Sequence, residues 1–313
     1  MSHSPEMMDC QHTVAAEVSC VGVSLHSGDM VNMFIRPAGP NTGITFVRKD
    51  IDGATNVVPA TFDAVTETTL GTTIANKHGV TVSTIEHLMA AIWGAGIDNV
   101  RIEMDGPEVP IMDGSSEPFT FLLECAGRVQ QRAARRVIEV LKEVRVEEGG
   151  SVASIKPADD FVLEVEIAFN HALIGSQKAR YDFSETTFRQ SLARARTFGF
   201  ARDVEKMRSM GLALGGSLHN AIVVGEDEIL NEGGLRYADE FVRHKALDCV
   251  GDYFLAGAKI HGEVATRRPG HGINNKLLRA LFADASNYRI LGGEEVDAPM
   301  QIERVQHEAQ MSA

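Results

Sequence analysis

Three side chains near residue 248 have the types and the spacing that metal coordination needs. His244, Asp248 and Asp252 recur every four residues within the stretch 241–252. On an α-helix this spacing places an imidazole and two carboxylates on one stripe, with the apolar residues between them on a neighbouring stripe. Imidazole nitrogen and carboxylate oxygen are both ordinary zinc ligands. The stretch is a candidate metal-binding helix, although a solvated i,i+4 pair is the commoner use of this spacing.

A second candidate pair, Glu86 and His87, stands at the start of an apolar segment. Ser83 followed three residues later by Glu86 is the capping-box pattern of a helix N-terminus. Glu86 therefore has two readings, a hydrogen bond back to the cap or a role in chemistry. His87 would lie in the first helical turn, where the positive end of the helix disfavours an imidazolium but accepts a neutral ligand.

The elements around these residues indicate an α+β protein with two similar domains. A chain of 313 residues exceeds the usual single-domain size. Each half runs from strands into a helix that carries an inward histidine, and then into a further strand. The polar, basic stretch 128–136 is most simply a solvated linker. The predicted division is a flexible tail at 1–12, a first domain at 13–127, the linker at 128–136, a second domain at 137–298 with an insert around 197–224, and a flexible tail at 299–313.

Composition narrows the class of function. The net charge of −13 disfavours nucleic-acid binding, because phosphate neutralisation needs a basic surface. The four cysteines form no paired zinc motif and no disulfide pattern, so any metal must be held by histidine and carboxylate. The sequence has no signal-peptide pattern and no apolar run of about 18 residues, the length that a membrane span requires. We expect a soluble, cytoplasmic protein.

Six motifs together carry a specific resemblance that spans almost the whole chain. The motifs are Ser-Thr-Ile-Glu-His-Leu-Met-Ala-Ala at 83–91, Gly-Ile-Asp-Asn at 96–99, Pro-Ile-Met-Asp-Gly-Ser at 110–115, Arg-Ala-Arg-Thr-Phe-Gly-Phe at 194–200, Phe-Val-Arg-His-Lys-x-Leu-Asp at 241–248 and Gly-His-x-x-Asn-Asn-Lys at 270–276. With these motifs the chain resembles the zinc-dependent UDP-3-O-acyl-N-acetylglucosamine deacetylases of lipid A biosynthesis, the pathway that supplies lipopolysaccharide.

The resemblance implies one Zn²⁺ per chain, bound by His87, His244 and Asp248, with water in the fourth position. A catalytic zinc site has this form, three protein ligands and one open position. By the same resemblance Glu86 is the general base. His271, in a glycine-flanked turn, is the general acid, and Asp252 would keep it cationic.

The resemblance also implies where the substrate binds. Thr197 would stabilise the oxyanion, Lys245 would contact a substrate phosphate or the oxyanion, and Phe198 would pack on the nucleotide. Leu70, in the hydroxyl-rich stretch 66–74, is a further candidate substrate contact. So is His26, which otherwise reads as an ordinary turn histidine. Residues 197–215 would form an apolar passage for the 3-O-acyl chain.

The expected reaction is hydrolysis of the N-acetyl group of UDP-3-O-acyl-N-acetylglucosamine, by a chain that we expect to be a monomer. Two alternative functions would use the same site residues. Another zinc amidohydrolase would act equally well on an unacylated N-acetyl sugar. A purely structural zinc would have a closed site, and then Glu86 and His271 would have no reason to face the metal.

Overall fold

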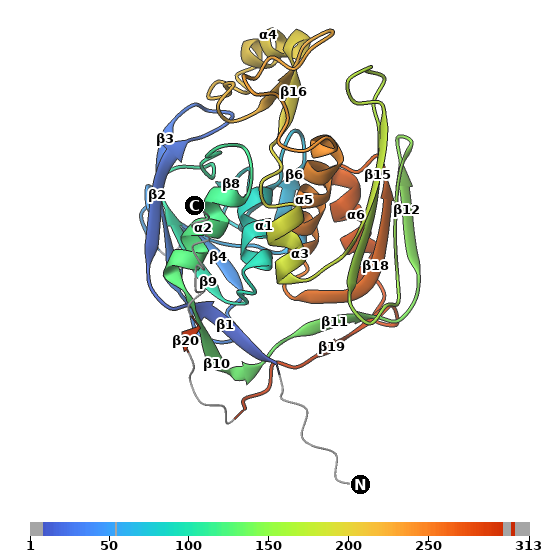
Figure 1. Cartoon of the computed structure of the whole chain (residues 1–313). Helices are drawn as coiled ribbons and strands as arrows, with labels where there is room; N and C mark the ends of the chain where they lie inside the picture. The colour runs from blue at the N-terminus through green and yellow to red at the C-terminus, as the bar shows by residue number, and fades with distance from the viewer. Residues whose placement is uncertain (1–8, 54, 297–301, 304–313) are drawn as a thin grey trace, which may run out of the picture.

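The computed structural model describes residues 9–53, 55–296 and 302–303. Two β-sheets lie on the outside and helices fill the space between them, so the layers run strand, helix, helix, strand (Figure 1). This arrangement confirms the predicted α+β class. None of the helices in the described part of the chain combines the length and the apolar character that a membrane-spanning helix needs.

The sheet of the N-terminal half has five strands, and it forms because apolar residues alternate along them. Val31, Met33 and Ile35 are buried, while the residues between them are more exposed. In sheet order the strands are β2 (Val18–Val23), β3 (Met30–Pro37), β9 (Val100–Met104), β4 (Ile44–Arg48) and β5 (Val57–Pro59). The helices of this half are α1 (Glu86–Gly94) and α2 (Glu117–Ala126). Both lie on the side of the sheet that faces the other half (Figure 1).

The sheet of the C-terminal half has seven strands and is mixed, because β18 (Lys259–Arg267) runs parallel to two of its neighbours. Those neighbours are β11 (Val137–Val140) and β14 (Phe161–Ala168). The remaining strands are β12 (Val144–Glu148), β13 (Ser151–Lys156), β15 (Ser176–Asp182) and β19 (Tyr288–Leu291). The helices of this half are α3 (Glu185–Ser191), α5 (Glu240–Phe254) and α6 (His271–Phe282).

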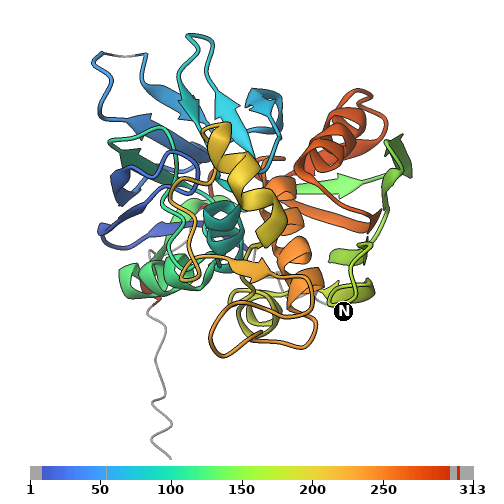
Figure 2. The ribbon, with the colours of Figure 1, turned by 90° about the horizontal axis from the view of Figure 1, so that it is seen from above.

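Two smaller groups of elements border the central helices. A short sheet of β6 (Val65–Glu67), β7 (Thr73–Ala75) and β8 (Thr81–Val82) precedes α1, after the 3₁₀ turn η1 (Phe62–Ala64). The predicted insert consists of β16 (Phe198–Phe200), α4 (Ala201–Ser209) and β17 (Ile222–Val224). Seen from above, α4 crosses over the space between the two sheets (Figure 2).

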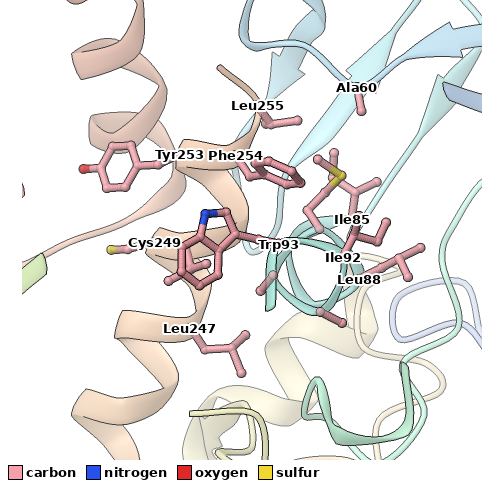
Figure 3. Packing of buried hydrophobic residues seen from close by; sticks show 14 of the residues in the cluster. Ala60, Ile85, Leu88, Ile92, Trp93, Leu247, Cys249, Tyr253, Phe254 and Leu255 are labelled. Carbon is pink, nitrogen blue, oxygen red and sulfur yellow. The ribbon is translucent and has the colours of Figure 1, made fainter. Parts of the chain in front are cut away.

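The close approach of α1 and α5 joins the two halves. At Gly251 of α5 a Cβ atom would lie 2.0 Å from the carbonyl oxygen of Glu86, so this position needs glycine. Beside it, Trp93 of α1 and Leu247 and Phe254 of α5 lie together in one buried hydrophobic cluster (Figure 3). Each such side chain contributes about 1.5–3 kcal/mol on burial, so the contact holds the two helices in one register.

The predicted linker and tails are wrong where the structure describes them. Residues 128–134 form β10 (Arg128–Ala134), which pairs with β1 (Cys10–Val14) and with β20 (Ile302–Glu303). The basic stretch 128–136 is not a solvated linker, because two of its four arginines have partners in other parts of the fold: Arg128 contacts Glu185 at 2.8 Å and Arg135 contacts Asp98 at 3.0 Å. The rest of both predicted tails, 1–8, 299–301 and 304–313, lies outside the described residues. A division into two domains stays a prediction.

The predicted capping box is also wrong. Helix α1 begins at Glu86 itself, its N-cap residue is Ile85, and no side chain makes a capping hydrogen bond. The Ser83 hydroxyl accepts a hydrogen bond from Thr73 Oγ1 instead (3.0 Å). The Glu86 carboxylate therefore does not cap the N-terminus of α1.

Candidate metal centre and its acid–base pair

His87, His244 and Asp248 come together where α1 packs on α5. Their donor atoms all lie within 4.8 Å of one another, and all three residues are buried. Asp248 Oδ1 is 3.5 Å from His87 Nε2 and 3.3 Å from His244 Nε2. His244 and Asp248 share one stripe of α5 because they are one helical turn apart, and α1 brings in His87.

These three residues fit a metal ion. Within the described part of the chain, Asp248 Oδ1 is a buried oxygen that receives no hydrogen bond. A buried carboxylate oxygen without a donor is costly unless a cation satisfies it. The other ring nitrogen of His244, Nδ1, is 3.1 Å from the Ala195 carbonyl, an orientation that leaves Nε2 directed at the group.

The charge states of the group agree with this fit. Burial lowers the pKa of His244 to about 3, so its imidazole is neutral and free to bind a cation. Burial alone would raise the pKa of Asp248, but the ammonium of Lys245 beside it holds that pKa below its usual range. Two imidazole nitrogens and one carboxylate oxygen are a donor set that zinc accepts, and geometry alone does not distinguish zinc from other divalent metals.

Glu86 lies beside the candidate ligands as the neighbour of His87 in the chain. It is 3% exposed, and its Oε2 accepts a hydrogen bond from the backbone N–H of Thr72 (2.9 Å). Burial raises the pKa of Glu86, while the nearby His271 opposes that rise. A carboxyl group with a raised pKa is suited to taking up a proton and releasing it again.

His271 is the partner of Glu86, and it comes from the opposite half. It is the first residue of α6 rather than part of a turn, which corrects the sequence-based expectation. Its Nδ1 lies 2.8 Å from Asp252 Oδ2, and its Nε2 lies 3.8 Å from Glu86 Oε1. Burial would lower the pKa of His271, but Asp252 and Glu86 raise it to about 10. The imidazole is therefore a cation at neutral pH.

Lys245 lies against the candidate metal group. Its ammonium donates a hydrogen bond to Asp248 Oδ2 (2.9 Å) and stands 5.8 Å from the centre of the Phe198 ring. The Phe198 ring is in turn 6.3 Å from the ring of His244. Lys245 and Phe198 thus border the candidate metal centre, and their contacts with a substrate stay predictions.

Thr197 precedes β16 and is held through its backbone. Its N–H donates to the Gly114 carbonyl and its own carbonyl accepts from the N–H of Ile222, both at 2.7 Å. These two bonds use only backbone groups and not the hydroxyl, which is the group that the predicted oxyanion contact requires. That role remains a prediction.

Leu70 and His26 have different surroundings. Leu70 is 50% exposed and has a φ of 59°, and it stands two residues before Thr72, whose N–H binds Glu86. The backbone N–H of His26 donates to Glu108 (3.0 Å), and its Nδ1 accepts from the N–H of Ala213 (3.4 Å). His26 thus fastens a turn to the segment after α4, and the structure shows no contact between its side chain and the three candidate ligands.

Two residues of this site were missed from the sequence. Thr72 donates hydrogen bonds to both Glu86 and Asp252, and Asn274 donates to Asp252 Oδ2 (2.8 Å). Asn274 belongs to the motif around His271, so its position in that motif was an available signal. Thr72 lies in the hydroxyl-rich stretch 66–74, whose composition alone does not distinguish it from its neighbours.

Comparison with known proteins agrees with this geometry. A family model described as LpxC, UDP-3-O-acyl N-acetylglycosamine deacetylase, matches residues 11–283. A relative from Shewanella pealeana, named UDP-3-O-acyl-N-acetylglucosamine deacetylase, is 48% identical over 293 residues, 93% of this chain and 95% of the relative. Relatives with the same name from Phenylobacterium zucineum (49% over 280 residues, 90% and 96%) and Histophilus somni (47% over 287 residues, 91% and 94%) match similarly. The resemblance in the motifs is confirmed, and the chain belongs to the UDP-3-O-acyl N-acetylglycosamine deacetylase family.

Proposed function

We propose that this chain hydrolyses the N-acetyl group of UDP-3-O-acyl-N-acetylglucosamine, releasing acetate and UDP-3-O-acyl-glucosamine, an early step of lipid A biosynthesis. Family membership and the names of the relatives support the substrate. The observation that carries the chemistry is the pairing of Glu86 with a cationic His271, 3.8 Å apart, beside three candidate metal ligands. A base and an acid in opposite protonation states are what amide hydrolysis requires.

The metal in this proposal is Zn²⁺, held by His87, His244 and Asp248. When bound, zinc supplies a Lewis acid and lowers the pKa of water to roughly 7. These three residues would hold the metal and would leave a fourth position for water or substrate, which the proposed chemistry needs. Lys245 supports the ligand set, because its bond to Asp248 Oδ2 leaves Oδ1 directed at the histidines.

The first half of the reaction belongs to Glu86. Its carboxylate accepts a proton from the attacking water, whose oxygen forms a bond to the acetamide carbonyl carbon. The backbone N–H of Thr72 holds Oε2, so Oε1, the oxygen nearer His271, is the one that takes the proton. The negative charge that develops on the carbonyl oxygen is stabilised by the Thr197 hydroxyl, in the manner of an oxyanion hole.

The second half belongs to His271. The bond between the carbonyl carbon and the nitrogen breaks, and the nitrogen leaves as an amine after accepting the proton on His271 Nε2. Asp252 holds Nδ1, so Nε2 is the nitrogen that faces Glu86 and the substrate. The products are acetate and the free amine on the sugar. The Asp252 carboxylate, 2.8 Å from Nδ1, stabilises the cation that precedes transfer and orients the ring.

Substrate selection is assigned to the segment 197–215 and the aromatic residues beside it. Phe198 would pack on the nucleotide, and the apolar side chains after it would line a passage for the 3-O-acyl chain. Each methylene buried there contributes about 0.8 kcal/mol, so an acylated substrate should exceed an unacylated one by several orders of magnitude in kcat/KM.

The test compares acetate release from acylated and unacylated UDP-N-acetylglucosamine by purified protein. We expect strong preference for the acylated substrate. Equal kcat/KM for the two would favour a zinc amidohydrolase of unacylated sugars instead. No acetate from either would overturn the proposed hydrolysis itself.

A further inference from the structure

Thr72 lies between Glu86, the proposed general base, and Asp252, the carboxylate that contacts the proposed general acid. It lies in the loop between β6 and β7 and is 2% exposed. Its backbone is held by the start of α1 on both sides, because its carbonyl accepts from the N–H of Ile85 (3.4 Å) and its own N–H donates to Glu86 Oε2 (2.9 Å). The position of its side chain is thereby set by the same helix that carries the base.

The hydroxyl of Thr72 reaches the opposite half of the molecule. Thr72 Oγ1 donates to Asp252 Oδ1 at 2.7 Å. The other oxygen, Oδ2, accepts from Asn274 Nδ2 and contacts His271 Nδ1, both at 2.8 Å. Within the described part of the chain, Thr72 is the hydrogen-bond donor to Oδ1. One residue therefore binds the general base through its backbone and the carboxylate behind the general acid through its side chain.

We propose that Thr72 is a positioning residue for the deacetylation proposed above, acting on His271 through Asp252. Asp252 is buried at 3% exposure, so loss of the hydroxyl leaves Oδ1 unsatisfied and free to turn toward another donor. His271 follows, because its Nδ1 is bound to the same carboxylate. A small rotation of the ring moves Nε2 away from the leaving nitrogen, and catalysis is sensitive to such displacement.

The test begins with Thr72→Val, which keeps the shape and the backbone N–H to Glu86 but removes the hydroxyl. We expect kcat to fall by about 10- to 100-fold, with KM changed less than about threefold and bound metal retained. Thr72→Ser, which restores the hydroxyl, should recover most of the kcat. The matched control is Thr73→Val: its hydroxyl contacts Ser83 on the short sheet, and the same substitution there should leave kcat within about twofold. If Thr72→Val does not fold, Thr72→Ala takes its place.

A double-mutant cycle with Asp252→Ala separates positioning from a general loss of structure. If Thr72 acts through Asp252, Thr72→Val should cost less than about twofold in kcat once Asp252 is Ala. A cost that is the same in both backgrounds, or failure of Thr72→Ser to restore kcat, would overturn the inference. So would a fully active Thr72→Val, which would leave the proposed hydrolysis intact. Wild-type protein that releases no acetate would overturn both.

Discussion

Two regions of the molecule differ in how firmly the fold holds them. One is the packed contact between α1 (Glu86–Gly94) and α5 (Glu240–Phe254), called the seam here, and the other is the segment 197–230. Of the 15 residues of α5, all but Arg243 and Lys245 are buried, whereas α4 has no buried residue. The polar groups of the seam bind one another, while apolar side chains of the segment are about half exposed: Met210, Leu214, Leu218 and Leu230. The fold thus fixes the groups that handle protons and metal, and leaves the surface assigned to the acyl chain open. Changes in the seam should abolish chemistry, and changes in the exposed apolar side chains of the segment should alter only substrate preference.

The largest effect is expected at the candidate ligands. His87→Ala, His244→Ala and Asp248→Ala should each lose bound zinc and lower kcat/KM on the order of 10⁴-fold or more, because three ligands cannot spare one. Metal content by elemental analysis, beside acetate release, is the measurement. Full zinc occupancy in all three variants would show that the metal lies elsewhere.

The sequence predicts the contacts of this seam that join residues close together in the chain, and it does not predict those that join distant segments. The pairing of His244 with Asp248 follows from helix periodicity, since both lie on one helix one turn apart. The approach of His87 to that helix depends on packing between distant segments, and only the family resemblance anticipated it. Thr72 escaped notice because its partners, Glu86 and Asp252, are brought to it by the fold.

The predicted linker failed for a related physical reason. A run of basic residues is usually a solvated surface, but Arg135 is 8% exposed and bonds to Asp98 and to Asp9 across the strands. The partners that make burial of this charge tolerable come from segments far away in the chain, so composition alone could not reveal them. The segment 197–224 contains β16, α4 and β17, and both its role as an insert and its use by an acyl chain stay predictions.

The second-largest effect is expected at Glu86 and His271, and its pH dependence distinguishes the general base from the general acid. Glu86→Ala and His271→Ala should both retain zinc, because neither is a ligand, and both should lower kcat by about 10²–10⁴-fold. In the wild type kcat/KM should be bell-shaped in pH, with Glu86 on the acidic limb and His271 on the basic limb. Glu86→Ala should remove the acidic limb and His271→Ala the basic one. If His271→Ala keeps the basic limb, that limb belongs to the water or to another group, and Glu86 acts as both base and acid.

A smaller effect is expected at Asp252. The Asp252 carboxylate and Glu86 raise the pKa of His271 to about 10 against the effect of burial. Asp252→Asn removes one of these two charges, so the pKa of His271 should fall and the basic limb of kcat/KM should move to lower pH by more than about one unit. A pH profile of both proteins checks the shift. An unmoved basic limb would mean that another group produces it.

The smallest effect is expected in the open segment. Leu214→Ser should lower kcat/KM for the acylated substrate by about 10-fold at most, through a weaker apolar contact with the acyl chain. The same variant should treat an unacylated substrate like the wild type and should retain zinc. Equal losses on both substrates would mean that the segment supports the catalytic centre, which would remove the contrast between the two regions.

The most direct test of the central claim is mass-spectrometric detection of acetate release from acylated UDP-N-acetylglucosamine, before and after chelation. The account predicts deacetylation by the metal-loaded protein, its loss after chelation, and its return when Zn²⁺ is added back to wild type but not to His244→Ala. Undiminished acetate release by protein shown to be free of metal would contradict the account.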